Sequence, residues 1–267
     1  MSELAFGGAA AAGYDRAVGH STAQSVPMLM QAARLAPGQR VLDIATGTGV
    51  AAEAAAAVVG PSGGIVAADL SADMIEQARH RLAGLPNVSV AIEDGQALSF
   101  ADCSFDAVLC SMGLMYFPDP ARGLAEFHRV LRHGGSAAVS VNTTPERSNV
   151  QRINLAIGRH VPALAEAAAR LFALGDAARL RMLFEEAGFQ DVEFATHTKR
   201  LAFPSFDAYF EPVERGGGAT GQAYMSLPEP VRRTVREDVR RELGDTGGPL
   251  DIDVEIGVAS GRRRTGA

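Results

Sequence analysis

The chain has 267 residues, of which 47% are hydrophobic and 21% charged, a composition typical of a globular protein with one large α/β domain. Its net charge of −6 argues against a nucleic-acid partner, because surfaces that bind nucleic acids carry clustered bases that neutralise phosphate groups. Two cysteines are too few for a disulfide scaffold and predict free thiols in a cytoplasmic protein. No apolar run approaches the roughly 20 residues that span a bilayer, and the first residues do not resemble a signal peptide, so no membrane partner is expected.

Short aliphatic runs alternate with amphipathic helical stretches in the first half of the chain. Strands are predicted over residues 40–46, 64–70, 88–94, 105–111 and 135–142. Helices are predicted over residues 50–59, 72–83 and 120–131. Ser71 stands where the N-cap of the second helix belongs. Near-continuous apolar strands separated by helices indicate a parallel sheet that is covered on both faces.

This regular alternation is interrupted twice after residue 142. Residues 146–178 and 204–248 form two insertions, and insertions of this size are commonly lids or binding elements. The other elements are predicted over residues 180–187 (helix), 192–203 (strand), 230–243 (charged helix) and 252–260 (strand). The arginine run at residues 262–264 is expected to be a solvated tail.

The first predicted strand ends in a glycine-rich turn that leads straight into a helix. Gly47 and Gly49 allow a sharp turn and place the helix N-terminus against a negatively charged group. Asp69 ends the second strand, where a carboxylate can accept hydrogen bonds from ribose hydroxyls, and Asp94 ends the third strand. Tight packing and a helix-capping turn are the structural alternatives. Ala52 stands where a nicotinamide enzyme places its last glycine, which leaves that class open.

Five motifs follow one another in order over residues 36–143. They read VLDIATGTG, VAADLSADMIEQAR, IEDGQALSF, SFDAVLCSMGLMYFPDP and EFHRVLRHGG. In this order and spacing the chain resembles the class I S-adenosylmethionine-dependent methyltransferases, and within them the branch similar to the methyltransferases of ubiquinone and menaquinone biosynthesis. The resemblance implies an α/β fold, a Rossmann-like seven-stranded sheet with helical cap insertions, and S-adenosylmethionine as the cofactor.

The resemblance also implies a domain organisation. The last strand should run antiparallel to the others, and the cap should lie over the carboxyl ends of the first, fourth and fifth strands. The expected segments are an N-terminal helical lid (1–35), the S-adenosylmethionine-binding core (36–145), a helical cap insertion (146–178), a core helix and strand (179–203), a second cap insertion (204–248) and the last strand with the tail (249–267).

Twelve residues are implied to hold the cofactor. Asp43 would support the turn at the methionyl end, and Asp69 would take the ribose hydroxyls. The other implied contacts are Ala45, Thr46 and Gly47 at the methionyl end, Leu70 and Met74 beside the adenine, Asp94, Gly95 and Gln96 at the adenine amino group, Ser111 near the carboxylate or sulfonium, and Tyr14 in the lid. The family often has glycine in place of Ala45, and we expect modest crowding there without loss of binding.

The implied reaction is methyl transfer to a small organic acceptor, such as a quinone-like or phenolic molecule. Oxygen is slightly favoured over carbon or nitrogen as the atom that accepts the methyl group. The alternatives are a methyltransferase-like module that binds the cofactor without turnover and, less favoured, a nicotinamide-dependent oxidoreductase. No catalytic base is assigned, no metal-ligand spacing is found, and the oligomeric state is left open. The candidate bases are Tyr116, His128 (expected at the solvated surface), His133 (expected at a helix end), His160, Asp207, Tyr209 and Tyr224.

Overall fold

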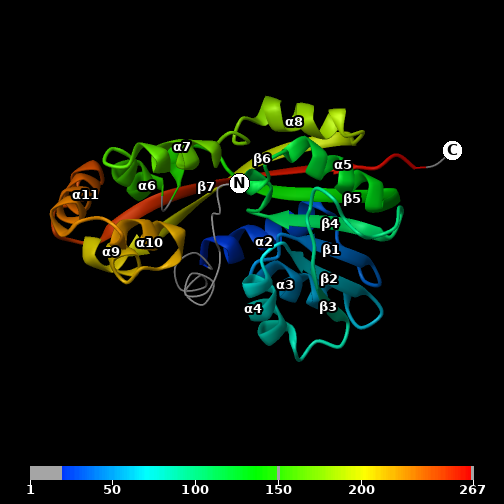
Figure 1. The fold of residues 1–267 in the computed structure, drawn as a ribbon. Coiled ribbons are helices and arrows are strands. Elements are labelled where there is room, and N and C mark those ends of the chain that lie inside the picture. The colour runs from blue at the N-terminus through cyan, green and yellow to red at the C-terminus, as the bar shows by residue number, and fades with distance from the viewer. Residues whose placement is uncertain (1–19, 149–150, 266–267) are drawn as a thin grey trace.

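The computed structural model describes residues 20–148 and 151–265 (Figure 1). This part of the chain contains a seven-stranded sheet in the order β3-β2-β1-β4-β5-β7-β6. The strands are β1 (Arg40–Ile44), β2 (Gly64–Asp69), β3 (Val88–Ile92), β4 (Phe105–Ser111), β5 (Leu131–Asn142), β6 (Gln190–Phe203) and β7 (Leu250–Arg262). β7 runs antiparallel to both of its neighbours, and the other pairs are parallel. The predicted seven-stranded sheet with an antiparallel last strand is confirmed.

Helices cover both faces of this sheet because alternate side chains of each strand point to opposite faces. Val41 of β1 packs with α2 (His20–Ala32), α3 (Val50–Val59) and α4 (Ala72–Leu82) on one face. Leu42, the next residue, packs with α5 (Pro120–Val130) and α8 (Ala177–Glu186) on the other. The N-cap of α4 is Ser71, whose hydroxyl accepts a hydrogen bond from the Met74 N–H at 3.3 Å, as predicted.

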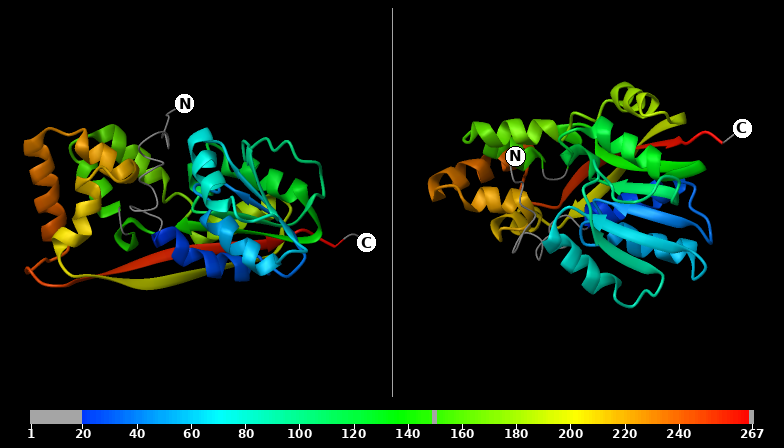
Figure 2. Two further views of the ribbon diagram at one scale, coloured as in Figure 1. Left: turned by 90° about the horizontal axis from the view of Figure 1, so that it is seen from below. Right: turned by 45° about the vertical axis from the view of Figure 1, so that its right-hand side comes forward.

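A second group of helices gathers beside the sheet, at the ends of β6 and β7 (Figure 2). It comprises α6 (Gln151–Gly158), α7 (Pro162–Arg170), α9 (Phe206–Glu214), α10 (Gly218–Met225) and α11 (Glu229–Glu242). Residues of α6, α9, α10 and α11 form a separate hydrophobic cluster with the distal ends of β6 and β7, which we call the cap cluster. Because β6 runs parallel to β5, the cap cluster lies on the side of the sheet where the parallel strands have their carboxyl ends.

The structure moves the predicted start of the fifth strand. β5 begins at Leu131, before Gly134 and Gly135, because the chain passes from helix to strand without a loop. Its pairing with β4 shifts register at this point, and a Cβ on Gly135 would lie 2.8 Å from the Asp106 carbonyl oxygen.

The expectation of a solvated arginine tail is wrong. Arg262 is the last residue of β7, and Arg263 is half-buried against the C-terminal end of α5. The Arg263 guanidinium donates to the carbonyl oxygens of His128, Arg129 and Leu131 at 2.9, 2.8 and 2.6 Å. It therefore satisfies carbonyl groups that the end of a helix leaves without intrahelical partners.

Candidate functional site

The carboxyl end of β1 turns sharply into α3. Ala45, Gly47 and Gly49 have φ values of 54°, 56° and 87°, so the turn is built from left-handed backbone. α3 begins at Val50, and its N-cap Gly49 offers no side-chain hydrogen bond to the first helical amides. Within the turn, the N–H groups of Thr46, Gly47 and Gly49 donate to the Ala68 carbonyl oxygen, the Asp69 carboxylate and the Thr46 carbonyl oxygen. The predicted turn is therefore fixed by its own hydrogen bonds at the carboxyl edge of the sheet, where open α/β sheets bind their ligands.

Asp43 lies directly beneath this turn and has no solvent exposure. The Thr46 hydroxyl donates to its Oδ2 at 2.5 Å, and its Oδ1 has no hydrogen-bond partner among the described residues. Burial raises the pKa of Asp43 to about 7, because the charged form loses its hydration. A buried carboxyl group with a free acceptor atom fits a ligand that brings a hydrogen-bond donor or a positive charge to the turn.

Asp69 joins the β1 turn to the start of α4. Its Oδ2 accepts from the Gly47 N–H and its Oδ1 from the Ser71 N–H, both at 2.9 Å. Burial raises the pKa of Asp69 as well, and these backbone hydrogen bonds oppose the rise. Each carboxylate oxygen can accept a second hydrogen bond, so the predicted contact with ribose hydroxyls is compatible with this role.

Apolar side chains are exposed at the carboxyl ends of β2 and β3. Leu70 is 68% exposed and Ile92 is 59% exposed, whereas Met74 is 3% exposed. Ile92 is aligned with Asp69 across the pair of strands, so it lies at the same edge as the turn. Sequence analysis missed Ile92, although it is the last apolar residue of a predicted strand. Leu70 and Ile92 therefore offer accessible apolar surface at this edge, whereas Met74 is buried.

The loop of residues 94–96 follows β3 and is tied to α5. Asp94 accepts from the Gln96 N–H at 2.9 Å through its Oδ1. The Gln96 side-chain oxygen accepts from the Asp119 N–H, and the Gln96 carbonyl oxygen accepts from the Arg122 guanidinium, both at 2.8 Å. Gln96 therefore holds the loop in place, and Gly95 is buried within it.

The carboxyl end of β4 accommodates the alanine at position 45. Ser111 is 8% exposed, and its hydroxyl lies 3.5 Å from the Ser25 hydroxyl of α2. A Cβ on Gly113 would lie 2.5 Å from the Ala45 Cβ, so the Ala45 methyl group fills space that Gly113 leaves open. Ala45 also packs against the hydrophobic cluster between the sheet and α5. The protein side of the turn thus has room for the Ala45 methyl group, and the expected crowding toward the cofactor stays a prediction. Tyr14 lies outside the described residues.

Most candidate bases have structural roles. Tyr209 and Tyr224 are buried in the cap cluster, where the Tyr224 hydroxyl donates to the Arg232 carbonyl oxygen at 3.1 Å. Burial raises the pKa of both tyrosines. Asp207 forms ion pairs with the guanidinium groups of Arg236 and Arg240, at 2.6 and 3.2 Å. These three side chains hold the cap together.

Two histidine expectations are wrong. His128 is half-buried and packs edge-on against Phe189, with ring centroids 5.1 Å apart. Burial, and then the charge of Arg263, lower its pKa. His133 lies within β5 beyond the helix end, and its Nδ1 is 3.2 Å from the Arg264 carbonyl oxygen.

Tyr116 and His160 are the two remaining candidates, and both are exposed, as His133 and Asp207 also are. Tyr116 ends the short 3-10 helix η2 (Leu114–Tyr116) just beyond β4 and is 39% exposed. His160 lies in the turn between α6 and α7. In the described ranges, no group of three or more His, Cys, Asp or Glu side chains could hold a metal ion, and no helix is long and apolar enough to cross a bilayer. Both cysteines are free thiols, as predicted.

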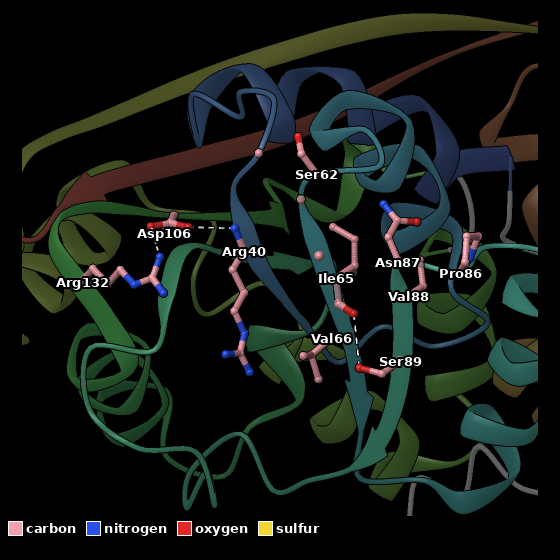
Figure 3. Close-up of a pocket in the computed structure, with 13 residues that line it drawn as sticks. Arg40, Ser62, Ile65, Val66, Pro86, Asn87, Val88, Ser89, Asp106 and Arg132 are labelled. Carbon is pink, nitrogen blue, oxygen red and sulfur yellow. Dashed lines mark hydrogen bonds and ion pairs between the residues drawn. The ribbon is translucent and has the colours of Figure 1, made fainter.

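A shallow depression of about 540 Å³ lies at the opposite, amino edge of the sheet (Figure 3). Asp106 lines it and accepts hydrogen bonds from the Arg40 N–H and the Arg132 guanidinium, both at 2.7 Å. This carboxylate thus has a structural role, joining β1, β4 and β5. The residues with open acceptor atoms and exposed apolar surface lie at the carboxyl edge, where we place the candidate site.

Comparisons with known proteins identify the family of the chain. The family model described as "Methyltransferase domain" matches residues 41–135. The demethylmenaquinone methyltransferase of Clavibacter sepedonicus is 44% identical over 116 residues, which are 43% of this chain and 46% of that protein. The ubiquinone/menaquinone biosynthesis C-methyltransferase UbiE of Geotalea uraniireducens is 38% identical over 115 residues, 42% of this chain and 49% of that one. The chain therefore spans about half the length of these relatives.

A further relative is matched over most of its length. The nocamycin O-methyltransferase of Saccharothrix syringae is 31% identical over 245 residues, 85% of this chain and 86% of that protein. Among solved structures, YcgJ of Bacillus subtilis has a TM-score of 0.62 at 19% identity and covers 91% of this chain and 99% of its own. The phosphoethanolamine N-methyltransferase 2 of Haemonchus contortus, in complex with phosphomonomethylethanolamine and S-adenosylhomocysteine, has a TM-score of 0.57 at 17% identity. The alignment covers 91% of this chain and 52% of that one.

The seven-stranded sheet with an antiparallel last strand matches the class I methyltransferase fold of solved structures such as the Haemonchus contortus enzyme. The nocamycin relative extends the likeness beyond the sheet to nearly the whole chain. The chain belongs to the S-adenosylmethionine-dependent methyltransferases, and within them it resembles UbiE and the demethylmenaquinone methyltransferases over the core.

Proposed function

We propose that this protein transfers the methyl group of S-adenosylmethionine to a small organic acceptor, with oxygen favoured as the accepting atom. One observation carries the choice of acceptor. The match to the nocamycin O-methyltransferase runs over 245 residues and so includes cap as well as core, whereas matches of 115 and 116 residues to the quinone relatives are too short to include both. The cap cluster lies on the acceptor side of the sheet, and it is this part that would select the acceptor.

The residues at the carboxyl edge fit the cofactor. The Oδ1 of Asp43 beneath the turn, which has no hydrogen-bond partner among the described residues, suits the positively charged methionyl end. Asp69 would accept from the ribose hydroxyls, Leu70 and Ile92 would flank the adenine, and Asp94 would accept from its amino group. When bound, S-adenosylmethionine supplies an electrophilic methyl group.

The chain itself has three tasks in such a reaction. It holds the acceptor in line with the methyl group, excludes water, and takes a proton from an acceptor hydroxyl. Holding reactants in position can lower a barrier by roughly 7–11 kcal/mol, and a base adds about 10²–10⁴-fold. Of the candidate bases, Tyr116 has the better position, because it lies at the end of β4 beside Ser111 and Gly113.

Binding and turnover test this proposal separately. Calorimetry should show binding of S-adenosylmethionine and S-adenosylhomocysteine and none of NAD, which would instead indicate an oxidoreductase. Methyl groups from labelled cofactor, added with enzyme to a cell extract, should appear in small molecules. Label in the RNA or protein fraction would contradict the acceptor class, and binding without any transfer would support the cofactor-binding module.

Asp69→Ala tests the cofactor placement. It removes the acceptor for the ribose hydroxyls and the support of the Gly47 and Ser71 amides, each hydrogen bond being worth roughly 0.5–1.5 kcal/mol. We expect S-adenosylhomocysteine affinity to fall at least tenfold. Asp73→Ala, an exposed carboxyl in the first turn of α4, is the matched control and should change affinity by less than threefold. Unchanged affinity in Asp69→Ala would show that the ribose lies elsewhere.

A further inference from the structure

The Phe117 ring lies between two glycines that belong to different elements. A Cβ on Gly95, in the loop after β3, would lie 2.6 Å from the Phe117 Cε2. A Cβ on Gly123, on α5, would lie 2.6 Å from the Phe117 Cδ2. Neither glycine has a positive φ, so the ring and not the backbone conformation requires glycine at both positions. The ring also meets Phe127 edge-on, with centroids 6.1 Å apart.

Hydrogen bonds also hold the loop of residues 94–96 against α5. Gln96 accepts from the Asp119 N–H and from the Arg122 guanidinium, so the loop of residues 94–96 is fixed to the first turn of α5. Asp119 is also the N-cap of α5, accepting from the Arg122 N–H at 3.1 Å. Between these ties the loop touches α5 through the Phe117 ring, with which Gly95 is in contact.

The segment that carries Phe117 touches the other cofactor turn as well. Gly113 lies against the Ala45 methyl group, four residues before Phe117. Tyr116, between them in sequence, is 39% exposed at the same edge. One short segment therefore contacts the turn after β1 through Gly113 and the loop after β3 through Phe117, and it presents Tyr116 beside them.

We propose that Phe117 is a positioning residue, which fixes the loop of residues 94–96 for cofactor binding and holds Tyr116 at the acceptor side. This inference rests on the proposed function. Because both glycines contact the ring at its Cε2 edge, a displacement of the ring imposed at α5 changes its contact with the loop. A methyl group on Gly123 must displace the ring, although Gly123 is on a helix and is not among the residues implied to hold the cofactor.

Gly123→Ala tests this through a change outside the site. Helix propensity alone favours alanine on α5, so a loss of binding would have to come from the ring. We expect S-adenosylhomocysteine affinity, measured by calorimetry, to fall at least tenfold. In Gly123→Ala/Phe117→Leu the affinity should return to within threefold of Phe117→Leu alone. Gly84→Ala is the control, because a Cβ there would meet no atom within 4 Å.

A second readout does not depend on the cofactor. The chain has no tryptophan, so Tyr116→Trp introduces a single tryptophan, on this segment, that can be excited selectively above the tyrosine absorption. In this background Gly123→Ala should shift the tryptophan emission of the unliganded protein, and adding Phe117→Leu should reverse the shift. If Gly123→Ala does not fold, Phe117→Leu alone serves, with an expected loss of affinity of threefold or more and a shifted tryptophan emission in the Tyr116→Trp background.

Three outcomes would overturn the inference. The first is an unchanged S-adenosylhomocysteine affinity in Gly123→Ala with a lowered Tm. The second is no recovery of affinity in Gly123→Ala/Phe117→Leu. The third is a tryptophan emission of Tyr116→Trp that neither Gly123→Ala nor Phe117→Leu changes. A wild-type protein that does not bind S-adenosylhomocysteine would instead contradict the proposed function, and the tryptophan emission would still decide the role of Phe117.

Discussion

The Asp43 carboxyl group is buried, so its ionisation destabilises the folded protein. Its pKa rises from 3.8 to about 7 on burial, so between these values the folded protein binds a proton that the unfolded chain has lost. Stability contributed by this group is therefore fully present below pH 3.8 and is lost as the pH rises to 7. The carboxyl group lies at the turn where the cofactor is expected, which gives a functional reason for keeping it.

Asp43→Asn should separate these two effects. Asparagine can still accept from the Thr46 hydroxyl but does not ionise. The free energy of unfolding of the variant should therefore rise relative to that of the wild type by about 1.4 kcal/mol per pH unit between about pH 4 and 7. Urea unfolding at several pH values measures this difference, and calorimetry should show weaker S-adenosylhomocysteine binding. A difference in stability that does not change with pH would contradict the assignment.

Ala45, at the end of β1, and Gly113, at the end of β4, lie so close that there is room for the side chain of only one of them. Gly113→Ala should destabilise the protein by about 1–3 kcal/mol, because its Cβ would lie 2.5 Å from the Ala45 Cβ. Ala45→Gly removes that methyl group and relieves a left-handed alanine at φ 54°. The exchange variant Ala45→Gly/Gly113→Ala should therefore recover most of the loss in urea unfolding. Strictly additive effects would show that the two residues do not compete for space.

At the scale of elements, α5 ends against the last strand of the sheet. Arg263, just after β7, donates to three carbonyl oxygens at the C-terminal end of α5 and at the start of β5. A single side chain from the end of the chain thus fixes the junction at which helix passes into strand without a loop. Hydrogen bonds from a charged donor are stronger than neutral ones, so this contact should be measurable.

Arg263→Met should lower the free energy of unfolding by about 1–3 kcal/mol, because the carbonyl groups lose their donor while the apolar stem is kept. Lysine should restore part of the loss, since it brings the charge without the planar guanidinium. Arg264→Met, at an exposed position next in sequence, is the control and should stay within about 0.5 kcal/mol. Equal effects at positions 263 and 264 would mean that only net charge matters.

At the scale of the whole molecule, the apolar interior is divided. Two clusters lie on the faces of the sheet, and the cap cluster forms a third at the distal ends of β6 and β7. The two strands pair over 12 aligned residues from Gln190 to Phe203 and thus connect cap and core as one continuous ribbon (Figure 2). Because the cap has its own interior, it can lose structure while the sheet remains folded.

Phe210→Ala tests this division. Phe210 is fully buried, stacked on Phe206 at 5.4 Å and edge-on to Tyr224 at 5.3 Å, so its loss should cost about 3–5 kcal/mol within the cap. Hydrogen exchange should accelerate in α9, α10 and α11 but not in β1 or β4, and S-adenosylhomocysteine affinity should change less than threefold. Phe127→Ala, in the cluster beneath α5, is the matched control and should accelerate exchange across the sheet. Uniform acceleration in Phe210→Ala would show a single cooperative unit.

Local sequence signals located the first four strands, the turn after β1 and the N-cap of α4. Strand periodicity, glycine in left-handed turns and a side chain that caps its own helix all act within a few residues, so they are visible in the chain itself. The start of β5 was misplaced because Gly134 and Gly135 look like a helix end, whereas the register shift against β4 places them inside a strand. Ile92 was missed because its exposure depends on the strand beside it.

The sequence by itself determined the fold class, the seven strands with an antiparallel last strand through its family resemblance, and the residues that reach the carboxyl edge, since strand ends and their turns are set by short-range chemistry. Tertiary structure alone decided that Gly113 makes room for Ala45, that Phe117 joins the loop of residues 94–96 to α5, and that Arg263 completes a helix more than 130 residues away. Each of these depends on two surfaces meeting across the sheet, and the fit of one side chain against another exists only once the long-range pairing of strands has brought them together.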